Sequence, residues 1–77
     1  MMGTPRWWTE IREEAIRKQD GAALRRKREA LGWSRNTAAT VTGFSPSYIG
    51  RVERGEVAIS MRRHKIFDIA YKAALDE

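Results

Sequence analysis

An outward row of four residues within the segment 46–54 carries side-chain types that read DNA bases. The row consists of Ser47, Gly50, Arg51 and Arg54. Its members are three, four and seven residues apart, so on a helix they share one face, opposite Ile49 and Val52. An arginine guanidinium donates two hydrogen bonds to N7 and O6 of guanine, and a glycine leaves room for close approach. The row therefore predicts a surface that reads base edges in a major groove.

The residues in and around this row have different expected partners. We expect Arg51 to read a base, Ser47 to contact a base or a phosphate, and Pro46 to contact a thymine methyl. Gly50 completes the base-reading set because it lets the helix approach closely. Backbone phosphates are the expected partners of Ser45, Tyr48, Arg54, Arg62 and Arg63. Two alternatives stay open: Tyr48 packs inward, or the arginines form only a solvated charged surface.

The charge of the chain is concentrated in its middle. The 77 residues include 15 Lys plus Arg and 10 Asp plus Glu, for a net charge of +5. Residues 1–20 hold four basic and four acidic side chains, residues 21–65 ten and three, and residues 66–77 one and three. A segment with this excess of arginine favours nucleic acid as a partner. The alternative is an arginine-rich helix surface with no ligand.

The sequence lacks the residues that catalysis, metal binding and cofactor binding need. The chain has no Cys, and its one imidazole is His64. It also has no glycine-rich phosphate loop and no paired-carboxylate motif, so we expect no enzyme, no metal and no cofactor. No run of 18 apolar residues is present, and the N-terminal segment turns acidic where a signal peptide is apolar. These features predict a cytoplasmic protein without a membrane partner.

Helix caps and helix-ending glycines predict an all-α bundle of about five short helices. The predicted ranges are 5–18, 21–31, 35–42, 46–54 and 61–75. The expected N-caps are Thr4, Asp20, Ser34, Ser45 and Ser60, and the expected C-terminal glycines are Gly32, Gly43 and Gly55. Residues 57–59 are expected to form a loop. The chain reads as one compact domain, residues 21–77, preceded by a helical extension, residues 1–20.

Surplus apolar residues on the first and last helices predict self-association. On the last helix, one apolar row is expected to face the core, and a second row adjoins it. The first row consists of Ile66, Ile69, Ala70 and Ala73, and the second of Phe67, Tyr71, Ala74 and Leu75. A core this small is not expected to bury both Trp7 and Trp8. The candidate dimer-interface residues are therefore Trp7, Trp8, Phe67, Tyr71 and Leu75, with the first helix folding back as the alternative.

The segments 35–42 and 46–54 fit a helix-turn-helix. Ala39 is small enough for the second helix to cross closely, and Gly43 supplies the positive φ of the turn. The matching sequence is LRRKREALGWSRNTAATVTGFSPSYIGRVERG. It resembles the Cro and repressor family of helix-turn-helix proteins (the XRE type) over about residues 22–55. The resemblance implies a lambda-repressor-like fold.

The resemblance also implies roles for individual residues. Arg28 and Glu53 are expected to form a partly buried structural ion pair. The family usually has Gln after the capping Ser, where it helps to hold a DNA phosphate. Here that position is Arg35, which can still meet a phosphate.

The leading hypothesis is a sequence-specific regulator of transcription that binds double-stranded DNA. We expect a bacterial or phage repressor acting as a homodimer on a two-fold symmetric operator. The alternative is a protein-interaction module, of the antitoxin or anti-activator type, that grips a regulatory protein partner through Trp7 and Trp8. An RNA-binding adaptor is a third reading.

Overall fold

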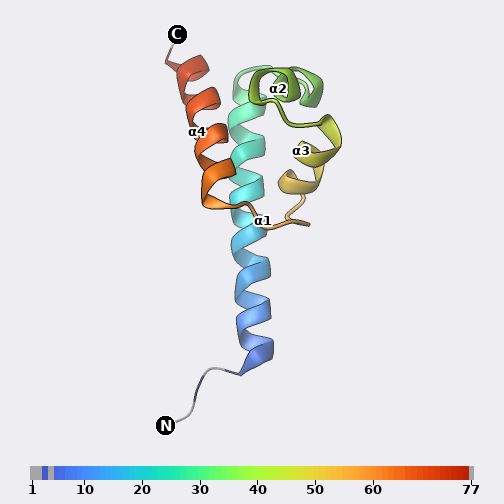
Figure 1. Cartoon of the computed structure of the whole chain (residues 1–77), viewed down its shortest axis with the longest axis vertical. Helices are drawn as coiled ribbons and strands as arrows, with labels where there is room; N and C mark the ends of the chain where they lie inside the picture. Colours follow the sequence, from blue (N-terminus) through green and yellow to red (C-terminus); the bar gives the residue numbers. More distant parts are fainter. Residues whose placement is uncertain (1–2, 4, 77) are drawn as a thin grey trace.

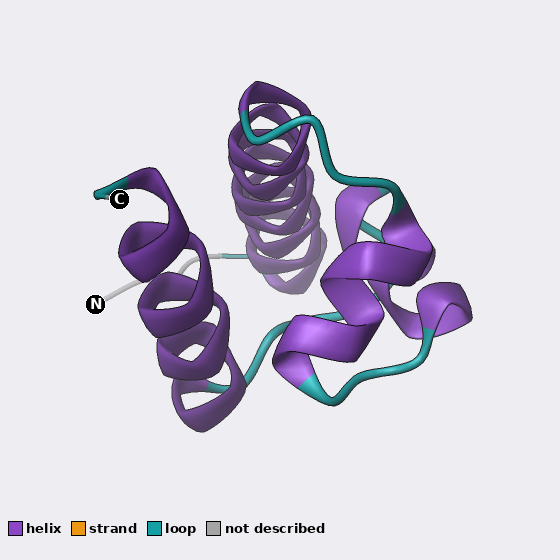
Figure 2. Cartoon of the chain, turned by 90° about the horizontal axis from the view of Figure 1, so that it is seen from above, coloured by secondary structure: helices purple, strands orange, loops and turns teal. Residues whose placement is uncertain are grey.

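The computed structural model describes residue 3 and residues 5–76, and this part of the chain forms four α-helices and no strand (Figure 1). The helices are α1 (Arg6–Ala30), α2 (Arg35–Thr42), α3 (Pro46–Glu53) and α4 (Met61–Leu75). The C-terminal half of α1 lies in the middle, with α4 on one side and α2 and α3 on the other (Figures 1 and 2). The N-terminal half of α1 projects away from the other helices (Figure 1).

The prediction of about five helices was wrong, because the ranges 5–18 and 21–31 form one helix of 25 residues. Asp20 does not cap a helix, and Gly21 is buried in the middle of α1. The physical reason is tertiary: the end of α3 crosses α1 at Gly21, where the carbonyl of Val52 leaves no room for a Cβ. Thr4, which we expected to cap the first helix, lies outside the described residues.

The other three helices begin where their serine caps predict. The side chains of Ser34, Ser45 and Ser60 accept hydrogen bonds from backbone amides two or three positions into α2, α3 and α4. These bonds satisfy amides that have no partner inside the helix. At the other end of α2, Gly43 adopts the left-handed conformation with φ 82°, which a side chain disfavours. Local chemistry thus fixes the lengths of α2 and α3.

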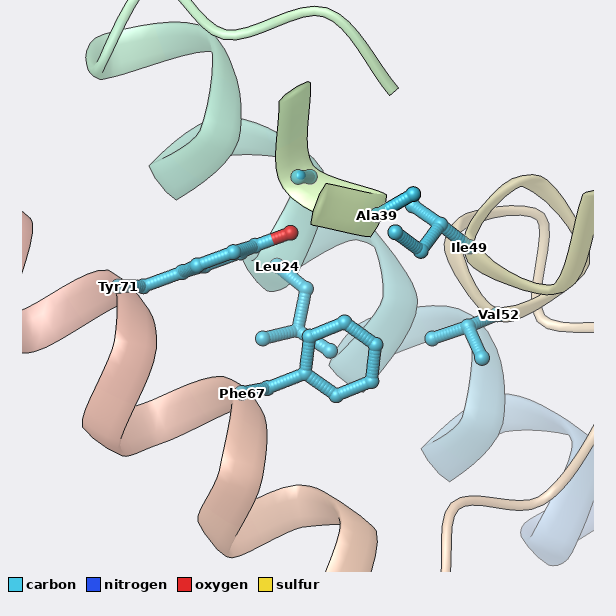
Figure 3. Packing of buried hydrophobic residues seen from close by; sticks show 7 residues of the cluster. Leu24, Ala39, Ile49, Val52, Phe67 and Tyr71 are labelled. Carbon is cyan, nitrogen blue, oxygen red and sulfur yellow. The ribbon is translucent and has the colours of Figure 1, made fainter. Parts of the chain in front are cut away.

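The core is a small cluster to which all four helices contribute (Figure 3). It consists of Leu24, Ala38, Ala39, Ile49, Val52, Phe67 and Tyr71. The two aromatic rings of α4 point between α1, α2 and α3, with their ring centroids 5.7 Å apart (Figure 3). Phe67 and Tyr71 are the largest side chains of the core, and the other five members are aliphatic.

The prediction of which face of α4 points inward was wrong. Phe67 and Tyr71 are each 1% exposed, whereas Ile69 is 71% exposed and Ile66 lies at the surface. Both aromatic residues were candidates for a dimer interface, and in the structure they belong to the core of a single chain. Phe67 and Tyr71 pack in one buried cluster with residues of α1, α2 and α3. Leu75 stays at the surface.

Candidate nucleic-acid interface

Helices α2 and α3 form a tight pair joined by the turn at Gly43 and Phe44. Ala39 is buried between them, and Ile49 is fully buried on the inner face of α3. The hydroxyl of Thr42 donates to the carbonyl of Ala38 at 2.7 Å and accepts from the amide of Phe44 at 3.3 Å. These contacts fix the direction in which α3 leaves the turn, and so the direction of its outer face.

The outer face of α3 presents Pro46, Ser47 and Arg51 to solvent, because all three are exposed. Gly50 differs from the expectation of an open surface: it is buried beneath two arginine side chains. A Cβ built on Gly50 would lie 3.0 Å from Nη1 of Arg54 and 3.7 Å from Nε of Arg35. The face therefore consists of exposed residues around a shallow glycine site that two guanidinium groups cover.

Both of these arginines are held by carboxylates of the same chain. Nε of Arg35 donates to Oε1 of Glu53 at 3.2 Å, and the Arg35 side chain remains 42% exposed. Arg54 forms an ion pair with Glu56, and both partners are about half exposed. Solvent screens the Arg54–Glu56 pair, so Arg54 can move to a phosphate at small cost. Arg35 can leave Glu53 because Arg28 stays hydrogen-bonded to that buried carboxylate. The sequence analysis missed Glu56, although its position two residues after Arg54 was an available signal.

Glu53 is mainly the partner of Arg28, deep beneath this face. Nε and Nη2 of Arg28 donate to the two carboxylate oxygens at 2.6 and 3.1 Å, and Nη1 donates to the carbonyl of Trp33 at 2.7 Å. The carboxylate of Glu53 is 1% exposed, and the hydrogen bond with it raises the pKa of Arg28 above its ordinary value. The pair joins α1 to α3 and is structural, because neither charge faces solvent.

Tyr48 connects α3 to the start of α4. Its ring lies 5.2 Å from that of Phe44, and the guanidinium carbon of Arg63 stands 5.0 Å from its centroid. The Tyr48 hydroxyl is enclosed and has no hydrogen-bond partner within the described residues. In this structure the hydroxyl is therefore not presented to a phosphate, and the inward-packing alternative describes Tyr48 better. The ring instead places Arg63 beside α3 through a cation–π contact.

A polar hollow opens at the start of α2, next to the outer face of α3, which we call the reading face. Its lining residues are Arg25, Arg28, Ser34, Arg35 and Asn36. Asn36 was missed by the sequence analysis, because an asparagine one position after a basic residue gives no signal of its own. On α4, Arg62 is exposed near Arg63, which places positive side chains on a second flank of α3.

The family described as a helix-turn-helix domain matches residues 21–77 of the chain. The chain belongs to this helix-turn-helix family. No curated protein and no solved structure matches it. In a helix-turn-helix protein the second helix of the pair enters the major groove, and here that helix is α3. Family membership and the basic outer face together indicate a DNA-binding protein.

The described residues of this helix-turn-helix protein contain neither a metal-ligand cluster nor a membrane-spanning helix. Within residue 3 and residues 5–76, no three His, Asp or Glu side chains come together as metal ligands do. No described helix has the length and apolar character needed to cross a membrane. The α2–α3 face is thus the site with the clearest chemistry.

Proposed function

We propose that this protein is a sequence-specific regulator of transcription of the Cro and repressor (XRE) type, with a lambda-repressor-like domain at residues 21–77 and an extension at residues 1–20. It binds a two-fold symmetric operator as a homodimer and represses by covering a promoter, in a bacterium or a phage. The observation that carries this proposal is the exposed face of α3, where Arg51 is framed by Arg35, Arg54 and Arg63.

Base readout is assigned to the exposed residues of α3, from Pro46 and Ser47 in its first turn to Arg51 in its last. Arg51 grips a guanine through two hydrogen bonds, Ser47 contacts the neighbouring base or phosphate, and Pro46 packs on a thymine methyl. Gly50 acts indirectly: without a side chain of its own, it lets the Arg35 and Arg54 stems lie flat across the helix. α3 can then approach the bases closely between two guanidinium groups.

Phosphate contacts surround this centre on both sides. Arg54 exchanges its exposed partner Glu56 for a phosphate, and Arg35 turns from the buried Glu53 to another, while Arg62 and Arg63 reach the backbone from α4. Ser45 contributes from the cap of α3, where free amides favour an anion. Each phosphate neutralised releases counterions, so affinity falls steeply with salt.

Dimeric binding explains how such a small reading surface specifies a site. One α3 touches only a few base pairs, and two helices about 34 Å apart on a two-fold symmetric site double the sequence information. Occupying that site excludes polymerase from an overlapping promoter. The protein-interaction alternative draws support from the exposed Trp7 and Trp8, but the family match and the face of α3 favour DNA.

The test is a binding selection of the purified protein against random duplex DNA at about 150 mM salt. We expect an enriched two-fold symmetric motif, with guanine at positions whose recovery depends on Arg51. Weak, salt-sensitive binding with no enriched motif contradicts sequence-specific regulation. In that case the interaction module becomes the better reading, and a search for a protein partner follows.

A further inference from the structure

The N-terminal half of α1 forms an arm, defined as residues 6–20, that stands clear of the core (Figure 1). Its first contacts with the rest of the chain come near its end, where Nε of Arg17 donates to the carbonyl of Gly55 at 3.4 Å. Lys18 packs against the same glycine. A free helix of this length is marginally stable in water, so its earlier turns need a partner to be well populated.

One face of the arm is an apolar stripe made of Trp7, Trp8, Ile11 and Ala15. The two tryptophans are 60% and 49% exposed and Ile11 is 55% exposed, with the indole rings packed edge to face at 6.2 Å. Trp8, Ile11 and Ala15 have the three-then-four spacing of a coiled-coil seam. The ion pairs Arg6–Glu10 and Glu14–Lys18 belong to the same turns, giving the stripe a polar margin.

The stripe lies beyond the domain to which the arm belongs, on the projecting part of α1 (Figure 1). At about 100° per residue, Ile11, Ala15 and Trp8 lie about 80–140° around α1 from Gly21, at which α3 docks, and Trp7 lies about 40° from it. Ile16 points elsewhere and lines a shallow hollow with Ala58 and Ile59. The arm extends beyond the other helices, so the described part of the chain has no element that covers the stripe (Figure 1).

We propose that this stripe is a dimerisation surface, and that it packs against the same stripe of a second copy of the chain. The exposed parts of its large side chains in two copies offer on the order of 1,000 Å², the lower range of specific interfaces. Charge also favours a second copy of the chain as the partner, because residues 6–20 hold four basic and four acidic side chains. Two neutral arms meet without the repulsion that keeps two basic reading domains apart, and the arm has no net attraction for a polyanion.

This pairing identifies the interface of the homodimer in the proposed function. Only the expected effect on operator binding rests on the proposed function. The stripe occupies the first turns of α1, before Gly21, and includes none of the exposed residues of α3, so pairing the arms leaves both reading faces open. Two copies joined in this way present two α3 helices to one duplex. The interface does not use Phe67 or Tyr71, which the core already buries.

The test is sedimentation equilibrium of the intact chain and three variants. We expect the wild-type chain to be a dimer. Ile11→Gln and the double variant Trp7→Gln, Trp8→Gln should weaken dimerisation by on the order of 100-fold. The matched control is Ile69→Gln, an equally large and exposed apolar residue on α4, and it should leave the dimer unchanged. Cooperative thermal unfolding of each variant shows that the domain itself remains folded.

A monomeric wild-type chain, a dimer that ignores the arm substitutions, or equal weakening by Ile69→Gln overturns the proposal. Recovery of a different protein on the arm of a monomeric chain overturns it as well. Measurements of DNA binding distinguish a failure of this dimerisation proposal from a failure of the proposed function. Arg51→Ala should remain a dimer and lose specific DNA, whereas the arm variants should bind a single half-site as the wild type does and lose only the gain from a second half-site.

Discussion

The backbone carbonyl oxygen of Val52 approaches Gly21 so closely that a Cβ on Gly21 would lie 2.2 Å from it. The carbonyl oxygen of Glu53 would lie 2.8 Å from the same atom. Both obstacles belong to the backbone at the end of α3 and cannot rotate away. Gly21 is therefore the point at which α1 allows the helix-turn-helix to dock.

Gly21→Ala should destabilise the fold by on the order of 3 kcal/mol, because α3 must shift away from α1. In an open helix the same change stabilises by up to about 1 kcal/mol, so the expected sign is reversed. Chemical denaturation of both proteins measures the difference. Gln19→Ala, at an exposed site two residues earlier on α1, is the control and should be nearly neutral. A more stable Gly21→Ala protein contradicts the close docking of α3.

Arg28→Ala should destabilise the protein by about 3–5 kcal/mol, because it leaves the carboxylate of Glu53 buried with a weaker partner. Arg35 also contacts that carboxylate, but its side chain is 42% exposed. Arg35→Ala should therefore cost much less, and thermal unfolding of the two variants compares them. An Arg28→Ala protein with unchanged melting and lost DNA binding would instead place Arg28 at the DNA.

The parts of the fold that depend on neighbouring residues were predictable, and the parts that depend on distant ones were not. Ser34 and Ser45 cap helices because a hydroxyl reaches an amide three residues away, whatever the rest of the chain does. Asp20 followed by Gly21 has the same local signature of a helix start. Gly21 instead makes room for the backbone of Val52, which passes close to it. Val52 lies 31 positions further along the chain, so the residues next to Gly21 give no sign of this contact.

The two faces of α4 show the same limit. Apolar content is similar in the row that begins at Ile66 and in the row that begins at Phe67, so periodicity alone cannot choose between them. The choice depends on which side of α4 the other three helices pack against, and Phe67 and Tyr71 are the residues that join their buried cluster. On the outer face of α3, residue types and spacing indicated Arg51 and Arg54 but not the burial of Gly50 beneath arginine side chains. The positions of those side chains depend on where the fold places Glu53 and Glu56.

Arg51→Ala should reduce affinity for the selected operator by about 1–3 kcal/mol and relax preference at one base position. Arg62→Ala should weaken all duplexes to a similar extent, because a phosphate contact carries no sequence information. Binding isotherms on the operator and on a scrambled duplex separate the two effects. Equal losses from both variants on both duplexes contradict the assignment of Arg51 to a base.

Glu56→Gln should tighten DNA binding about threefold without changing sequence preference, because it frees Arg54 from its carboxylate partner and removes a charge that repels phosphate. The matched control is Glu10→Gln, which removes the same charge from an ion pair with Arg6 on the arm. That site is far from α3, so its effect should be smaller. Equal tightening by both variants would show a net-charge effect and not a role of Glu56 at Arg54.

Tyr71→Phe should be neutral or stabilising by up to about 1 kcal/mol, although Tyr71 is 1% exposed. Its hydroxyl is buried and has no hydrogen-bond partner within the described residues, so removing it relieves a desolvated polar group. The ring contacts with Phe67 and Trp33 remain in the variant. Denaturation at neutral pH measures this part, and a loss of about 2 kcal/mol would reveal a partner for the hydroxyl.

The same pair of proteins should differ in alkaline solution. Burial, followed by the nearby charge of Glu53, raises the pKa of Tyr71 from 10.0 to about 12. Between these values the unfolded chain has lost the phenol proton while the folded chain retains it, so the stability of the wild type falls as pH rises from about 10 to about 12. The expected loss is about 2 kcal/mol, and the Tyr71→Phe protein should lack it. The two proteins differ only at residue 71, so the difference between their denaturation curves isolates Tyr71. Parallel loss of stability in the two proteins would show that the phenol of Tyr71 ionises as readily in the folded chain as in the unfolded one.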